Sequence, residues 1–219
     1  MKFNSRKDIE YIQKSDKAYE YILGYISGHK DTLAIRKLNR AYSGMYYIPN
    51  LIKGYNFYLF FTMTETNHRA CFFDLKVKSN RNAIGISIVV EEEANSSNEV
   101  KKFLLPRIVS ILKTRKSSLI HELSHLFDYL KHKDINDTST NLVEYYNDYH
   151  EINSFYIQFI TVFKKRYDKK FKTFEDFRRQ FFYLLNLQNK DFWKYLNSIN
   201  RKKFLIRLYQ FWDDNYRLK

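Results

Sequence analysis

Apolar and polar residues recur with two different periods along this chain, and the change of period divides it. Between residues 8 and 41 apolar side chains return every three or four positions, which is typical of amphipathic helices. The pattern breaks near residues 28–30, so we expect two helices within residues 1–50.

After Gly44 the pattern becomes that of β-strands. Runs rich in aromatic and β-branched residues, separated by the polar segments TETNH and SNRN, cover residues 55–63, 70–78 and 84–91. In the last run one face is apolar at a period of two, formed by Ile84, Ile86, Ile88 and Val90. We therefore predict a small antiparallel meander within residues 51–95.

Helical periodicity returns at Glu99 and continues to the C-terminus. Pro106 interrupts the first of these segments, since proline is tolerated in a helix only near the first turn. Further helices are expected over residues 119–132 and 149–167, and three or so shorter ones from Thr173 onward, with Thr173 as an N-cap.

Together these patterns predict an α+β protein in which a small antiparallel sheet precedes a mostly helical C-terminal half. A length of 219 residues favours one domain. Its expected parts are N-terminal helices over 1–50, the sheet over 51–95, helices that carry the candidate site over 99–165, and a helical extension over 166–219.

The composition narrows the class of protein. A hydrophobic fraction of 44% and an aromatic fraction of 18% exclude a disordered polyelectrolyte. The net charge of +14 would attract phosphate backbones or other anionic partners. However, the chain is rich in Lys, Asn, Ile, Tyr and Phe together, which a codon bias produces without any such partner, and we favour that explanation.

Cys71 is the only cysteine, so no intrachain disulfide can form, which fits a reducing compartment. The N-terminal segment lacks the apolar core of a secretory signal. No run approaches the roughly 18 apolar residues of a membrane span. We expect a cytoplasmic protein with no membrane partner.

The chemistry is concentrated in the string SSLIHELSHLFDYLKH, which contains an HExxH motif. On a helix His121 and His125 lie one turn apart and about 40° around the axis, so both imidazoles can reach one metal ion. Glu122 lies beside them, where its carboxylate can take a proton from a water on the metal. The rest of the helix surface is apolar, with Leu119, Ile120, Leu123, Leu126, Phe127 and Leu130.

The HExxH motif can also be explained without a metal site. Chance produces HExxH in roughly one such sequence per hundred, and the two histidines would then be ordinary helix residues. On an apolar helix, however, two histidines and a glutamate must be desolvated, which costs free energy unless something compensates them. We therefore favour a metal site. Asp128, on nearly the same side, either accepts a hydrogen bond from a ligand histidine or faces solvent and pairs with Lys131 or His132.

A catalytic zinc usually takes three protein ligands, so a third must lie outside this helix. The segment NLVEYYNDYHEINSFYIQ offers several candidates. Glu151 is our choice because it opens a strongly apolar helix, although an acid there also suits the helix dipole for structural reasons alone. Glu144 is the alternative third ligand, and His150 comes after it.

HELSH followed by a downstream glutamate resembles the gluzincin branch of the zincin metallopeptidases. The strings HELSHLFDY and EYYNDYHEINSFYIQ are also similar to small zincin-like proteins of bacteriophages and bacteria, in which an HELxHxxD helix precedes a helix opening with an E-x-N-A type segment. Ser154 stands where alanine is commoner. The resemblance covers about residues 119–159, a fifth of the chain.

The resemblance implies a zincin fold that binds one Zn²⁺ per chain through His121, His125 and Glu151, and hydrolyses peptide bonds of a protein or peptide substrate. It also implies a substrate-aligning edge strand before the metal helix, for which Ile86 and Ile88 of residues 84–91 are well placed. A Tyr or His would stabilise the oxyanion. Tyr145, Tyr146 and Tyr149 are near in sequence, and we choose none of them.

Two other functions remain open. The first is a zincin fold kept for structural or interaction work, as a component packaged in a phage particle or an inhibitor of a host protein. The second is a nucleic-acid-binding module, indicated by the basic segments KTRK, KKRYDKKFK and RKKFLIR at residues 113–116, 164–172 and 201–207. We favour the simpler interpretation that these segments are solvated faces of amphipathic helices.

Overall fold

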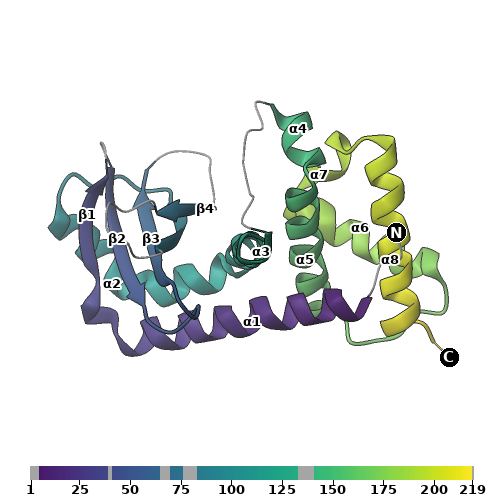
Figure 1. Cartoon of the computed structure of the whole chain (residues 1–219), viewed down its shortest axis with the longest axis horizontal. Coiled ribbons are helices and arrows are strands. Elements are labelled where there is room, and N and C mark those ends of the chain that lie inside the picture. The colour runs from purple at the N-terminus through teal and green to yellow at the C-terminus, as the bar shows by residue number, and fades with distance from the viewer. Residues whose placement is uncertain (1–4, 39–40, 65–69, 76–82, 133–140, 219) are drawn as a thin grey trace. The chain divides into compact units, whose positions relative to one another are not determined.

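The computed structural model describes residues 5–38, 41–64, 70–75, 83–132 and 141–218, and these form an α+β protein (Figure 1). They fall into two compact units. We call residues 15–126 the sheet unit, and residues 1–14 with 127–219 the helical unit. The N-terminal helix α1 (Ser5–Gly28) and the helix α3 (Lys116–His132) each contribute residues to both units.

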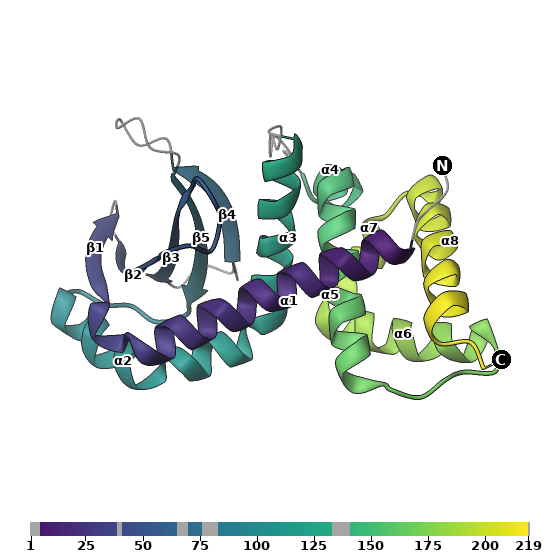
Figure 2. The same ribbon diagram turned by 60° about the horizontal axis from the view of Figure 1, so that its bottom comes forward.

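The sheet unit contains a mixed sheet with the strand order β1-β2-β3-β5-β4, which Figure 2 shows. Its strands are β1 (Ala34–Leu38), β2 (Ala41–Ile48), β3 (Asn56–Met63), β4 (Ala70–Leu75) and β5 (Ala83–Val90). The pair β3–β5 is parallel and the other pairs are antiparallel. The predicted antiparallel meander is therefore wrong, because β5 pairs with β3 and with β4 and thereby separates these two strands.

Strand β5 also departs from the predicted one-sided pattern. All eight of its residues are buried, so the glycine and serine positions between the isoleucines are covered as well. An internal strand packed on both faces reads as a nearly continuous apolar run, as AIGISIVV does. The expected turns at residues 65–68 and 79–82 lie outside the described residues.

The N-terminal region forms one helix instead of two. After α1 the chain makes a short 3₁₀ turn, η1 (Lys30–Thr32), and then the antiparallel hairpin of β1 and β2. The second expected helix is therefore wrong, because the Tyr-rich β2 pairs with both β1 and β3 and cross-strand packing outweighs local periodicity. Gly44 in β2 is packed tightly: a Cβ there would lie 2.5 Å from Cδ1 of Leu104.

Leu104 belongs to α2 (Ser97–Thr114), which packs against β1 and β2. Ser96 caps this helix by accepting a hydrogen bond from the backbone of Glu99. Pro106 lies in the helix interior and not near its first turn, so that expectation is wrong. Pro106 is on the exposed face, where water can solvate the carbonyl it leaves unbonded, while a buried stripe holds the opposite face: Val100, Leu104, Ile108 and Leu112.

The structure confirms the predicted C-terminal helices. The expected segments over 119–132 and 149–167 correspond to α3 and α5 (Tyr149–Arg166), joined through the short α4 (Leu142–Asn147). Three helices follow in the described residues: α6 (Phe174–Gln188), α7 (Lys190–Tyr195) and α8 (Ser198–Asn215). Thr173 caps α6 through a hydrogen bond from the backbone of Asp176, as predicted.

An aromatic core holds these helices together. Phe159 and Phe163 of α5 contact rings of the following helices, among them Phe177, Phe181 and Phe192. Rings of this size bury a large apolar area and dominate the packing free energy. Across the described part of the chain, no helix combines the length and the apolar character that a membrane crossing requires.

Candidate metal centre

Helix α3 carries the HExxH motif on a buried segment. His121, Glu122 and His125 are 5%, 7% and 6% exposed, so all three polar side chains have been withdrawn from water. The apolar residues around them are buried too, namely Leu119, Ile120, Leu123, Leu126 and Phe127. Burying three such groups is costly unless other polar groups or an ion compensate them.

The two histidines of the motif face each other within this helix. Their Nε2 atoms are 3.0 Å apart, and the ring planes are nearly perpendicular. A tetrahedral zinc with Zn–N bonds of about 2.0–2.1 Å holds its two nitrogens roughly 3.3 Å apart. The pair would therefore need to open by only a few tenths of an ångström to bind one ion.

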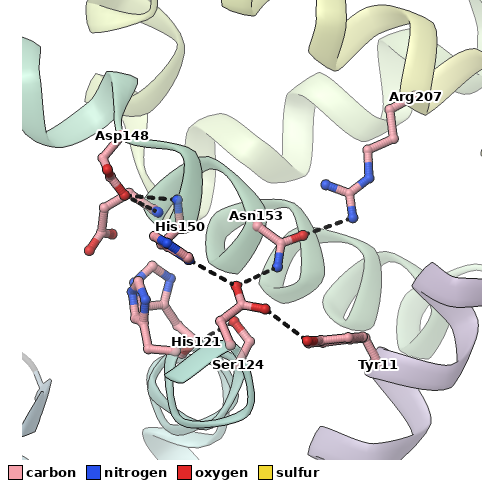
Figure 3. Close-up of polar contacts among 10 residues, drawn as sticks. Tyr11, His121, Ser124, Asp148, His150, Asn153 and Arg207 are labelled. Carbon is pink, nitrogen blue, oxygen red and sulfur yellow. Dashed lines mark hydrogen bonds and ion pairs between the residues drawn. The ribbon is translucent and has the colours of Figure 1, made fainter. Parts of the chain in front are cut away.

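Helix α5 begins with a firm cap next to Glu151. The carboxylate of Asp148 accepts hydrogen bonds from the backbone N–H groups of His150, at 2.8 Å, and of Glu151, at 3.2 Å (Figure 3). These are two of the N–H groups that have no partner within a helix. The cap fixes the first turn of α5, and with it the backbone that carries Glu151.

Within the helical unit, Asp128 of α3 joins this helix to α5 and α1. Its Oδ2 accepts hydrogen bonds from Nδ2 of Asn153, at 2.9 Å, and from Nδ1 of His150, at 3.5 Å, and its Oδ1 accepts one of 2.8 Å from the hydroxyl of Tyr11. Figure 3 shows Tyr11, His150 and Asn153 converging on this carboxylate. Burial, followed by the negative charge of Asp128, raises the pKa of Tyr11 well above its usual value, so Tyr11 remains a donor.

His150 and Asn153 flank Glu151 on α5, and Asp128 follows His125 by three residues on α3. The contacts of Asp128 therefore hold the first turns of α5 against the end of α3. Ligand atoms of His121, His125 and Glu151 all lie within 4.8 Å of one another, and the group could hold a metal ion. Glu144 is exposed on α4 and belongs to no such group among the described residues.

These residues form the ligand set chosen from the sequence. Two imidazoles and one carboxylate are a donor set that zinc accepts at catalytic sites. Ligation itself stays a prediction, as does a hydrogen bond from Asp128 to a ligand histidine. The alternative in which Asp128 faces solvent is wrong, because Asp128 is 4% exposed.

The residues proposed from the sequence for substrate alignment and oxyanion stabilisation have the following positions in the structure. Ile86 and Ile88 are fully buried in β5, whose two edges are occupied by β3 and β4. The prediction that they form a substrate-aligning edge strand is therefore wrong, because β5 has no open edge for a peptide to pair with. Tyr146 is buried and exchanges hydrogen bonds with Asn189, whereas Tyr149 is 63% exposed.

Sequence reasoning missed the residues that support Asp128. Asn153 is the asparagine of the E-x-N-A type segment, but the sequence gives it no role, and nothing in the sequence distinguishes Tyr11 from other tyrosines. Arg207 was assigned to a solvated basic face, yet its side chain is only 11% exposed and forms an ion pair with Asp8, 199 residues away. No local pattern could have revealed these contacts, because each depends on tertiary packing.

The basic segment 113–116 is engaged in ion pairs within the sheet unit. Arg115 pairs with Glu91, and Lys116 pairs with both Asp16 and Glu20. Partial neutralisation by carboxylates weakens the attraction of this segment for phosphates. Binding of nucleic acid is not tested by this observation and stays an alternative.

Comparison with known proteins adds no relative. The chain matches no protein family, no curated protein and no solved structure. The function must therefore be argued from the candidate centre itself.

Proposed function

We propose that this protein is a zinc-dependent peptidase of the zincin type, which binds one Zn²⁺ through His121, His125 and Glu151. The observation that supports the proposal is the grouping of these three ligand atoms around an HExxH helix. The resemblance of HELSH and the downstream glutamate to gluzincins supports the same reading.

Zinc at such a centre would polarise the carbonyl of a peptide bond and acidify a water molecule. Glu122 would accept the proton of that water and deliver it to the amine that leaves. Glu122 suits this role because it neighbours His121 in the motif and is 7% exposed, so little solvent competes for its carboxylate. The expected substrate is a protein or peptide.

Asp128 would keep the centre in order. Its carboxylate receives three hydrogen bonds in the helical unit, so its position on α3 is fixed relative to α5. Outer groups of this kind orient metal ligands and raise metal affinity. The proposed mechanism needs few catalytic groups, and the surrounding helices hold these groups in position.

The test compares the wild-type protein with Glu122→Gln, loaded with zinc, on a fluorogenic peptide library. We expect wild-type cleavage that a chelator abolishes, and a loss of roughly 10²–10⁴-fold in Glu122→Gln, which removes the general base. Glu122→Gln should still bind zinc, because Glu122 is not a ligand. The matched control Glu144→Gln, changed at an exposed glutamate, should cleave like the wild type.

Cleavage that persists in Glu122→Gln would show that the proposed chemistry is wrong. Zinc binding without cleavage of any peptide in the wild type would favour the alternative in which the fold has a structural or interaction role.

A further inference from the structure

Arg207 of α8 stands at the head of a chain of hydrogen bonds inside the helical unit. Its Nη2 and Nε donate to the two carboxylate oxygens of Asp8, at 2.7 and 3.1 Å. Nη2 also donates to Oδ1 of Asn153, at 2.9 Å. The guanidinium also lies over the ring of Tyr156, 3.8 Å from the ring centroid. This cation–π contact helps to fix the guanidinium in addition to its hydrogen bonds.

The amide of Asn153 lies between a cation and a carboxylate, and this decides its orientation. A guanidinium can only donate hydrogen bonds, and an ionised carboxylate can only accept them. Asn153 therefore turns its oxygen to Arg207 and its NH₂ group to Asp128 (Figure 3). The reverse orientation would place NH₂ against the guanidinium and oxygen against the carboxylate, and both contacts would be lost.

We infer that Arg207 is a positioning residue for the metal centre, acting through Asn153 on Asp128. The inference rests on the proposed zinc site. Asn153 follows Glu151 by two residues on α5, and Asp128 follows His125 by three on α3. The bond between Asn153 and Asp128 therefore fixes the backbones that carry two of the proposed ligands.

This arrangement gives the C-terminal helix a role in the centre. Helix α8 contributes none of the proposed ligands, yet its Arg207 determines which way Asn153 donates. Asp8 holds Arg207 in place and belongs to α1, as does Tyr11, which is another donor to Asp128. Helix α1 thus contacts the Asp128 carboxylate directly through Tyr11, and α8 acts on it through Asn153.

The experiment measures zinc affinity by competition with a chromophoric chelator, using the full chain at a temperature where circular dichroism shows each variant to be folded. Arg207→Gln removes the cation, and Asn153→Asp keeps an acceptor for Arg207 but puts a carboxylate against Asp128. We expect each variant to bind zinc 10–100-fold more weakly, as for loss of outer-shell partners elsewhere. The double variant should be little worse than either single variant, because both changes break one chain of contacts.

The matched control is Gln180→Ala, which removes an internal hydrogen bond of 2.9 Å from Tyr167 in the same unit. It should lower stability without changing zinc affinity. Should Arg207→Gln fail to fold, Asn153→Asp alone decides, since it retains a partner for Arg207. Wild-type affinity in the folded variants would overturn this inference and leave the proposed function standing. Absence of zinc binding in the wild type would overturn both.

Discussion

Asp8 and Arg207 lie 199 residues apart and form an ion pair with two hydrogen bonds, 2.7 and 3.1 Å long. Their side chains are each 11% exposed, so both charges are largely removed from water. The pair joins α1 to α8 and thereby connects the N-terminal and C-terminal helices of the helical unit. Such a pair is costly to break on one side only, since the remaining charge is left buried.

The ion pair makes a prediction about stability. Arg207→Ala should lower the free energy of unfolding by about 3–5 kcal/mol, because Asp8 loses its partner in a buried place. Asp8→Ala should cost a similar amount, and the double variant clearly less than the sum. Urea denaturation measures all three.

The control for this cycle is Arg178→Ala, which breaks an exposed pair with Glu175 on α6. A surface pair of this kind contributes about 0–1 kcal/mol. Equal losses for Arg178→Ala and Arg207→Ala would contradict the buried character of the Asp8 pair.

Glu151 and Glu144 provide a test of the third ligand. Glu151→Ala should weaken zinc binding by more than the roughly 10–100-fold that loss of an outer-shell partner costs, because a direct ligand is removed. Glu144→Ala should leave the affinity unchanged, since Glu144 is exposed on α4. Competition with a chelator measures both, and the reverse result would make Glu144 the ligand.

Gly44 predicts a packing effect in the sheet unit. In Gly44→Ala the new methyl group would lie 2.5 Å from Cδ1 of Leu104 and 2.9 Å from Cδ1 of Leu33. Overpacking of this kind costs about 1–3 kcal/mol. Gly24→Ala is the control, because nothing lies within 4 Å of its Cβ and the exposed helix position should gain about 0.5–1 kcal/mol. Thermal denaturation that shifts both variants in the same direction would refute the close approach of α2 to β2.

Tyr46 predicts an alkaline effect. Burial, and then the charge of Asp31, raises the pKa of Tyr46 to about 12, whereas an unfolded tyrosine titrates near about 10. The folded state therefore keeps a proton that the unfolded state releases, so the stability it contributes is present below about pH 10 and is lost as the pH rises toward about 12.

The variant Tyr46→Phe isolates this contribution. It loses the hydroxyl hydrogen bond to the carbonyl of Lys30, which should cost about 1 kcal/mol at neutral pH. The difference in stability between wild type and variant should shrink between about pH 10 and 12, because only the wild type has the titrating group. Chemical denaturation across this range checks it, and a constant difference would contradict the raised pKa.

The parts that sequence predicted are those whose signal is local. The HExxH helix and α5 follow from helical periodicity and from spacing within a few residues, and Thr173 acts as the expected cap. Strands β3, β4 and β5 are predicted for the same reason, but their pairing is not, because alternation along one strand does not say which strands pair with it.

The missed parts depend on contacts between distant residues. Residues 34–38 lie within the segment of helical spacing, yet antiparallel pairing with β2 makes them the strand β1. Arg207 lies in a basic run in which Lys202 and Lys203 are exposed, and its ion pair with Asp8 accompanies its withdrawal from water. The role of Asn153 likewise depends on its hydrogen bonds to Arg207 and to Asp128, which are distant in sequence.

The central claim is that His121 and His125 bind zinc. Its most direct test is the metal content per chain of the purified protein after dialysis against a weak chelator, beside the double variant His121→Ala, His125→Ala. We predict about one zinc per wild-type chain and none in the folded double variant. A wild type without zinc, or a double variant that retains it, would contradict the metal centre.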